Sequence, residues 1–313
     1  MKKHKIVCFG GGTGLSELLK GLKLNPWLDI SAVVTMFDSG GSSRVLRDRF
    51  GVLPSGDINR CVLALTPQKH EPTLREIFDQ RLKDNHTPLN VWSIGAEHIY
   101  GDYQTVIDQM CSMFFALGRV FPVSIEKSNI CTEFIDGTIV RSETEIDLHI
   151  RNSKEDVARL FLDPSVSAHA PAIQAIREAE IICIGPGSFY TSVLPNFLPI
   201  GISEAIGRSS APIIFIENLM IEGLGMALYQ DVDYVVKLES HIERSVSKAV
   251  INNHIPTNLL ESYAKDENKR PLLPTDSSNI FVPKALWLDG TLARHHSARL
   301  AYVVSSLVEE LLK

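Results

Sequence analysis

The sequence predicts an α/β protein, in which a Rossmann-like, doubly wound and mostly parallel sheet carries a small antiparallel hairpin insertion. Two observations support this fold. Short apolar runs typical of buried strands alternate with stretches of helical periodicity through most of the 313 residues. One segment, near residues 130–150, instead carries a hairpin signal. Strands separated by helices pair in parallel through right-handed crossovers, so we expect one domain over residues 1–313 with the insertion at about 122–150.

In the first half, a strand at residues 6–9 leads through a glycine turn into a helix whose leucines recur at helical spacing. A second strand is predicted at Ile30–Phe37 and a helix around Ile58–Leu65. Further on, a helix is predicted at Ile99–Leu117, because apolar residues fall on one helical face there. These residues are Ile99, Tyr103, Val106, Ile107, Met110, Phe114 and Leu117.

In the second half, Asp136-Gly137 separates two strand-like runs, which is a strong signal for a hairpin turn. Buried strands are predicted at Ile181–Ile184 and Ile213–Ile216, each preceded by a helix-like stretch. Between residues 252 and 283, Pro, Asn and charges dominate and predict a loop with short elements. The last predicted element is an amphipathic helix at Ser297–Leu312.

Composition narrows the class of protein. The chain is 44% hydrophobic and 22% charged, as globular proteins are, and its net charge of −6 argues against binding along a nucleic-acid backbone. The five cysteines stand singly without a CxxC pair, which predicts buried free thiols rather than disulfides or a zinc site. No apolar run approaches the ~18 residues of a membrane span. We therefore expect a cytoplasmic protein that binds neither nucleic acid nor membrane.

The most informative segment is the glycine turn between the first strand and the first helix. Unpaired amides and the helix dipole favour an anion at a helix N-terminus, so this turn is predicted to bind phosphate. The residues concerned are Gly11, Gly12, Thr13 and Gly14. The dinucleotide fingerprint would require another glycine at Leu15, and no Lys-Ser/Thr pair closes the turn as in a P-loop.

A second candidate loop follows the second strand. Asp38 lies about where the acidic residue of a Rossmann fold takes a ribose hydroxyl, and it could equally hold a metal ion between phosphates. Ser39, Gly41 and Ser42 offer donors for an anion-binding nest. The structural alternative is a Gly/Ser turn capped by Asp38.

A third loop precedes the helix around Ile58–Leu65. Asp57 is either the N-cap of that helix or, with Asn59 and Arg60, part of a polar cluster suited to phosphate or sugar. The sequence favours neither interpretation.

A fourth loop follows the strand Ile181–Ile184 and has the same strand-to-helix character as the glycine turn. The Gly-x-Ser-x-Gly pattern of a nucleophile elbow is absent from it. Asn218, at the end of the next strand, completes the polar rim. The candidates in the fourth loop are Gly185, Gly187, Ser188 and Thr191.

Several of these motifs resemble the CofD/YvcK family, and the match runs in order along essentially the whole chain. The motifs are Phe9-Gly10-Gly11-Gly12-Thr13-Gly14-Leu15, Val33-Val34-Thr35, Asp38-Ser39-Gly40-Gly41-Ser42-Ser43, Gly56-Asp57-Ile58 and the run from Ile184 to Pro195. The family's Tyr-Ala and Arg-His patterns are met at Tyr263-Ala264 and Arg294-His295. The chain looks closer to the YvcK branch than to CofD proper.

The resemblance implies a Rossmann-like nucleotide-binding fold with Tyr263 and Arg294 contacting the nucleotide or sugar. Members of the YvcK branch bind a UDP-sugar, typically UDP-N-acetylglucosamine, and influence central carbon metabolism, cell-wall synthesis and cell shape. CofD members transfer a phospholactyl-type group from a guanosine-activated donor to a deazaflavin, with magnesium assisting. Asp38 would then be the metal ligand.

The chain departs from the family pattern in three places. His86 and Asn90 match the usual Gly-His-x-x-Gly-Asn, which implies that both contribute to the nucleotide site, but both glycines are replaced. The Arg-Asn pair expected after Gly-Asp-Ile is inverted as Asn59-Arg60. Asn218 matches, whereas the segment from Ile221 to Gly225 differs.

From these observations we expect a cytoplasmic regulatory factor that binds a nucleotide-sugar and requires no cofactor. No nucleophile–base pair is legible among the motifs, which favours a binder over an enzyme. The alternative is a CofD-like, magnesium-dependent transferase. The apolar C-terminal helix could pack either within the domain or across a homodimer, and the sequence favours neither. No protein partner is indicated.

Overall fold

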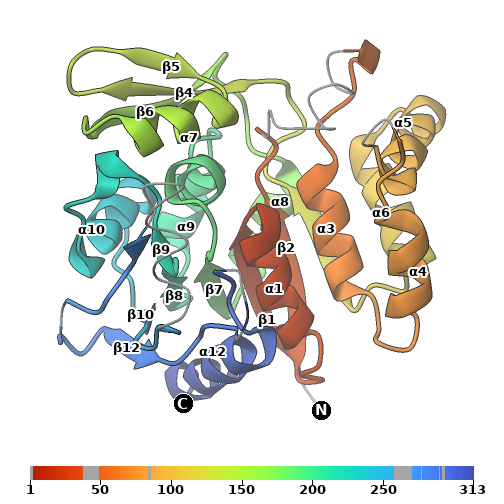
Figure 1. Cartoon of the computed structure of the whole chain (residues 1–313). Helices are drawn as coiled ribbons and strands as arrows, with labels where there is room; N and C mark the ends of the chain where they lie inside the picture. Colours follow the sequence, from red (N-terminus) through yellow and green to blue (C-terminus); the bar gives the residue numbers. More distant parts are fainter. Residues whose placement is uncertain are drawn as a thin grey trace.

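A seven-stranded parallel sheet forms the centre of the computed structural model, in the order β12-β10-β8-β7-β1-β2-β3 (Figure 1). The structure describes residues 3–37, 49–83, 86–256, 270–275, 277–288, 290 and 293–313. The strands of this sheet are β1 (His4–Gly10), β2 (Leu28–Val34), β3 (Gly118–Pro122), β7 (Ile181–Ile184), β8 (Ile213–Ile216), β10 (Lys248–Asn252) and β12 (Phe281–Lys284). The predicted fold class is therefore confirmed.

Helices cover both faces of the sheet, as a doubly wound fold requires. On one face α1 (Gly12–Leu22) packs between α3 (Gly56–Leu65) and α12 (Ser297–Leu311). A second row is formed by α8 (Ala170–Glu178), α9 (Ile202–Arg208) and α10 (Asp231–Ile242), with α8 behind the sheet in Figure 1. Beyond β3 lie α4 (Glu71–Phe78), α5 (Pro88–Tyr100) and α6 (Tyr103–Met113).

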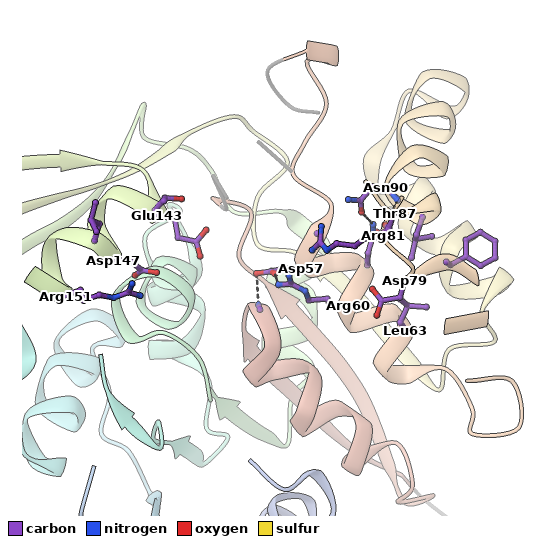
Figure 2. A pocket seen from close by; sticks show the side chains of 17 residues that line it. Asp57, Arg60, Leu63, Asp79, Arg81, Thr87, Asn90, Glu143, Asp147 and Arg151 are labelled. Atoms are coloured by element: carbon purple, nitrogen blue, oxygen red, sulfur yellow. Dashed lines mark hydrogen bonds and ion pairs between the residues drawn. The ribbon is translucent and has the colours of Figure 1, made fainter. Parts of the chain in front are cut away.

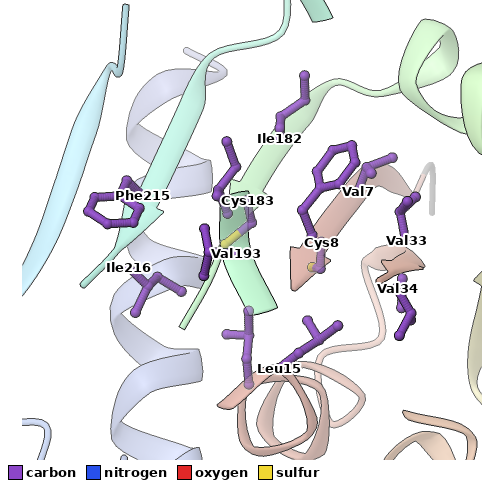
Figure 3. Packing of buried hydrophobic residues seen from close by; sticks show 14 of the residues in the cluster. Val7, Cys8, Leu15, Val33, Val34, Ile182, Cys183, Val193, Phe215 and Ile216 are labelled. Carbon is purple, nitrogen blue, oxygen red and sulfur yellow. The ribbon is translucent and has the colours of Figure 1, made fainter. Parts of the chain in front are cut away.

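The central strands carry continuous apolar runs because both of their faces are covered. Ile6–Phe9 in β1 and all of β7 are buried, and Cys8 lies opposite Cys183 in the paired register. Figure 3 shows this cluster, with Leu15 of α1 packing beneath the strands. A hydrogen bond from the Cys8 thiol to Cys183 stabilises the protonated form, and together with burial it raises the pKa of Cys8. All five cysteines are free thiols, as predicted, although Cys111 is only partly buried.

A small antiparallel sheet lies at one end of the main sheet and consists of β4 (Asn129–Phe134), β5 (Ile139–Arg141) and β6 (Val157–Asp163). Gly137, with φ of +85°, forms the predicted turn between β4 and β5. The third strand, β6, was not predicted. Helix α7 (Glu143–Asn152) links β5 to β6 and packs under the sheet.

The prediction of a helix at Ile99–Leu117 was wrong, because the chain forms two helices there. Gly101 ends α5 in the left-handed conformation, with φ of +68°. Asp102 then caps α6 by accepting the Thr105 N–H at 2.8 Å. The middle of the predicted apolar face is buried, but Ile99 is 81% exposed and Leu117 is 49% exposed. A glycine cap followed by an acidic cap overrides the apolar periodicity.

Other helix and strand boundaries differ from the predicted ones by a few residues. The second strand is Leu28–Val34, so Thr35–Phe37 already belong to the loop beyond it. After β7 the chain forms two short turns in place of a regular helix. They are a π-helical turn, η1 (Phe189–Val193), and a 3-10 turn, η2 (Leu194–Phe197). Between residues 252 and 283 the described parts hold short elements, as predicted, and β12 contains a proline because it is an edge strand. The remaining short elements are β9 (Met220–Ile221), η3 (Leu224–Met226) and β11 (Arg270–Pro271).

Gly21 tests the packing of α1 against α12. A β-carbon at Gly21 would overlap the Ser297 carbonyl and lie 2.5 Å from Ala301 Cβ. We expect Gly21→Ala to lower the free energy of unfolding by about 1–3 kcal/mol, because two helices must move apart. Gly207→Ala in α9 is the control, since a β-carbon there meets nothing within 4 Å. Urea unfolding should show that this control is neutral or slightly stabilising, and equal effects at both positions would contradict the packing.

Candidate functional site

The candidate site lies where the strand order reverses, which is where ligands bind in open α/β sheets. From β1 the chain proceeds to β2 and β3 on one side, whereas β7 and β8 lie on the other. The carboxyl ends of β1 and β7 therefore adjoin, and each is followed by one of the glycine-containing loops. Gly14 lies so close to Pro186 that a β-carbon on it would overlap the Pro186 carbonyl oxygen.

The glycine turn presents backbone amides, as predicted. Helix α1 begins at Gly12, whose φ is +61°, and Gly11 precedes it in an extended conformation. The first turn of α1 carries no acidic side chain of its own. Because the first amides of a helix have no intrahelical acceptor, the amides of Gly12, Thr13 and Gly14 need acceptors from elsewhere.

One such acceptor is Asp57. The Gly12 N–H donates to Asp57 Oδ2 at 2.6 Å, and Asp57 Oδ1 accepts from Arg60 Nη1 at 3.0 Å. The N-cap position of α3 belongs to Ser55, so Asp57 is not the cap of that helix. It is instead one of the polar groups at the glycine turn, through its hydrogen bonds with Gly12 and Arg60.

A cavity of about 520 Å³ opens beside the glycine turn, and we call it the glycine-loop cavity. It brings together most of the predicted phosphate-binding residues from the loops after β1, β7 and β8, together with Arg294 from the segment before α12. The predicted residues that line it are Gly11, Gly12, Thr13, Gly14, Gly187, Ser188, Asn218 and Arg294.

A second cavity, of about 460 Å³, lies between α3 and α7, and we call it the α3–α7 cavity (Figure 2). Asp57, Asn59 and Asn90 line it among the predicted residues. Gly12 and Arg60 line both cavities, so the two spaces meet at the N-terminus of α1.

The two walls of the α3–α7 cavity are held by side-chain hydrogen bonds. On the α3 side, Asn59 Nδ2 donates to Asn90 Oδ1 at 2.7 Å, which ties α3 to α5. On the α7 side, the Thr191 hydroxyl donates to Asp147 Oδ1 at 3.0 Å and lies 2.6 Å from the Ser188 hydroxyl. Thr191 therefore connects the loop after β7 to the inserted helix.

Some predicted residues fall elsewhere. Gly185, His86 and Thr191 are not among the residues that line either cavity. Position 185 requires a glycine for structural reasons, since its φ is +84° and a β-carbon there would lie 2.5 Å from the Ile216 carbonyl oxygen. The predicted residues Asp38, Ser39, Gly41, Ser42 and Tyr263 lie outside the described residues.

Sequence reasoning missed the contribution of α7. Glu143, Asp147 and Arg151 line the α3–α7 cavity and face α3 across it in Figure 2. Their spacing of four residues places them on one helical face, which could have singled them out. Glu222 was also missed. It accepts the Phe189 N–H at 3.0 Å and Asn218 Nδ2 at 2.8 Å, so it joins the loops after β7 and β8.

Buried ionisable groups lie at the glycine-loop cavity: Glu17 and His295 line it, and Glu217 is next to His295. Burial alone would raise the pKa of Glu17, but Lys20 at 2.6 Å and the Ser297 hydroxyl outweigh it, and the pKa is lowered. Burial raises the pKa of Glu217, and the neighbouring Asp231 raises it further. Burial also lowers the pKa of His295 to about 4, against a hydrogen bond to the Glu217 backbone that would raise it.

Across the described ranges, no group of three or more His, Cys, Asp and Glu side chains is arranged to hold a metal ion. Within the same part of the chain, none of the helices combines the length and apolar character needed to cross a bilayer.

The fold and site together define a Rossmann-like α/β protein whose glycine turn lies at the switch point of its sheet. A family model described as 2-phospho-L-lactate transferase CofD matches residues 6–280. The chain therefore belongs to the CofD/YvcK family, as the motifs indicated.

Similar proteins place the chain with the YvcK-like members. A gluconeogenesis factor from Halalkalibacterium halodurans is 38% identical over 247 residues, which cover 77% of this chain and 74% of that protein. A gluconeogenesis factor from Listeria monocytogenes is 30% identical over 309 residues, which cover 96% of this chain and 94% of that protein. Two crystal structures of a Bacillus halodurans protein, described in one case as a member of the UPF0052 family, superimpose with TM-scores of 0.87 and 0.88. They are 31% and 32% identical, and each covers 100% of both chains.

The lowered pKa of His295, which lines the glycine-loop cavity, can be tested by the pH dependence of stability. Its folded pKa of about 4 lies below the ordinary value of 6.5, so the unfolded chain binds more protons between these values and stability falls as pH is lowered. From about pH 7.5 to about pH 5 this loss amounts to about 2 kcal/mol. His295→Asn keeps a donor for the Glu217 carbonyl but cannot titrate. Urea unfolding should show a smaller loss in this variant over the same range, and equal losses would contradict a buried neutral imidazole.

Proposed function

We propose that this protein is a cytoplasmic regulatory factor that binds a nucleotide-sugar of the UDP-N-acetylglucosamine type and acts on central carbon metabolism and cell-wall synthesis. The observation that carries the proposal is the meeting of two cavities at the N-terminus of α1. A nucleoside diphosphate sugar has the matching form, with a charged diphosphate between two larger polar groups. In this binding mode the diphosphate lies at the junction and one polar group enters each cavity.

The donors at the junction suit a diphosphate. The first-turn amides of α1 and the Gly187-Ser188 segment offer hydrogen-bond donors, and Arg60 and Arg294 supply positive charge. On the α3–α7 side the exposed polar groups are carboxylates, amides and arginines, which are the partners of sugar hydroxyls. The name gluconeogenesis factor, carried by the relatives, supports a role in carbon metabolism.

The partners of the hydroxyl groups favour binding over catalysis. The Ser188 and Thr191 hydroxyls lie within hydrogen-bonding distance of Glu222 and Asp147 respectively, rather than of a histidine. His295 is buried, and burial keeps its imidazole neutral. A hydroxyl nucleophile is most often activated by an adjacent histidine, and the described residues of the site do not pair a hydroxyl with a histidine.

The CofD family model supports a second candidate function, a magnesium-dependent transferase acting on a guanosine-activated donor and a deazaflavin. In that case Asp38, with Asp57 nearby in the chain, would hold the ion, which would offset the charge of the phosphates. Asp57 is engaged by Gly12 and Arg60 in this structure.

Calorimetric titration of the full chain with UDP-N-acetylglucosamine, UDP, GDP and GTP, each with and without magnesium, separates the two functions. We expect UDP-N-acetylglucosamine to bind without magnesium and without turnover. Arg294→Ala should weaken this binding at least about 10-fold, because a charge-assisted hydrogen bond is lost. Arg208→Ala is the control, since Arg208 is 77% exposed on α9 and pairs only with Glu204 on its own helix in the described contacts. Magnesium-dependent binding of a guanine nucleotide with product release would establish the transferase instead.

A further inference from the structure

We propose that Asp57 is an internal anion that occupies a phosphate-binding amide of the glycine turn and competes with the phosphate of an incoming ligand. This inference rests on the anion-binding role proposed above for the turn, and it concerns the regulation of that same site. Its consequence is that removing the Asp57 charge strengthens the binding of phosphorylated ligands.

The first argument is the position of the carboxylate. Asp57 Oδ2 lies 2.6 Å from the Gly12 nitrogen, which is a short distance for an N–H donor and typical of an ionised acceptor. Gly12 is the first residue of α1, where the helix dipole attracts an anion. Asp57 therefore takes the place that a phosphate oxygen would otherwise take at this amide.

The second argument is the lack of space for two acceptors. A β-carbon on Gly11 would lie 2.7 Å from Asp57 Oδ2 and 2.5 Å from Thr35 Cγ2, so the carboxylate is packed directly against the turn. The Asp57 side chain is only 8% exposed. A phosphate oxygen can reach the Gly12 amide only if the carboxylate withdraws.

The third argument concerns charge. A phosphate bound at the neighbouring amides of Thr13 and Gly14 would lie next to the Asp57 carboxylate, and like charges at that separation repel. Arg60 is the counter-ion of Asp57 at 3.0 Å, yet its side chain is 44% exposed and lines both cavities. Arg60 can therefore turn to an entering phosphate, which removes one of the interactions that hold Asp57 at the turn.

The loop after β7 shows the same arrangement at its own amide. Glu222 Oε2 accepts the Phe189 N–H at 3.0 Å, so in both loops a carboxylate from a neighbouring segment takes an amide at the start of a helical turn. Arg60, the ion-pair partner of Asp57, lines both cavities, so an entering phosphate reaches the Asp57 ion pair directly.

The test is calorimetric titration of the full chain in magnesium-free buffer with inorganic pyrophosphate and with UDP-N-acetylglucosamine. We expect Asp57→Asn, which has the same shape without the charge, to bind both probes at least about 10-fold more tightly than the unaltered chain. Asp57→Ser should behave in the same way, so that a folding defect of one variant does not decide the result. Uridine, which has no phosphate, should gain nothing.

Asp102→Asn is the matched control. Asp102 likewise accepts a backbone N–H at the start of a helix, at 2.8 Å from Thr105, but it does not line either cavity. This control changes the net charge equally and should leave both affinities unchanged.

The outcomes separate this inference from the proposed function. If UDP-N-acetylglucosamine does not bind but both Asp57 variants gain affinity for pyrophosphate, the ligand assignment fails and the role of Asp57 stands. If the unaltered chain binds UDP-N-acetylglucosamine and both variants bind the probes equally or more weakly, the competition is refuted while the proposed function stands. An equal gain in Asp102→Asn would also refute it, because net charge would then explain the effect.

Discussion

The close approach of two loops at the ends of β1 and β7 is the constraint on which the site depends. Gly14 lies against the Pro186 carbonyl and Gly11 lies against Thr35 and Asp57, so neither position has room for a side chain. The floor of the site is consequently made of backbone amides rather than side chains. Amides held rigidly by a sheet recognise an anion by position, and the carboxylates of Asp57 and Glu222 take two of these amides in the structure.

The small antiparallel sheet contributes to the site through α7. Helix α7 forms the wall of the α3–α7 cavity opposite α3. Its Asp147 accepts a hydrogen bond from Thr191 in the loop after β7. A second connection runs from Tyr190, 2.6 Å from the Tyr229 hydroxyl, and on from Tyr229 to Asp156 at the start of β6. Both connections begin in η1, so the loop that adjoins the glycine turn also positions the insertion.

Local patterns predicted the parallel sheet, the hairpin turn and half of the residues that line the glycine-loop cavity. They failed where two local signals competed. Apolar periodicity across Ile99–Leu117 predicted a helix, but the caps at Gly101 and Asp102 divided it. They also failed at β6, whose pairing with β4 is a long-range contact without a turn signal. The α7 wall was missed because a charged helical face can equally be exposed to solvent. Only the packing of α7 opposite α3 makes this face one wall of a cavity.

The sequence by itself determined the alternation of strands and helices in the main sheet and the glycine turn at the start of α1, because both follow from neighbouring residues. Only the tertiary structure decided what Asp57 does. From the sequence it was equally a cap of its own helix or a site residue, and 45 positions separate it from Gly12. Sheet pairing brings α1 and α3 side by side, and that packing directs the carboxylate across to the turn. The physical reason is that hydrogen-bond partners distant in sequence are selected by packing, which no local pattern encodes.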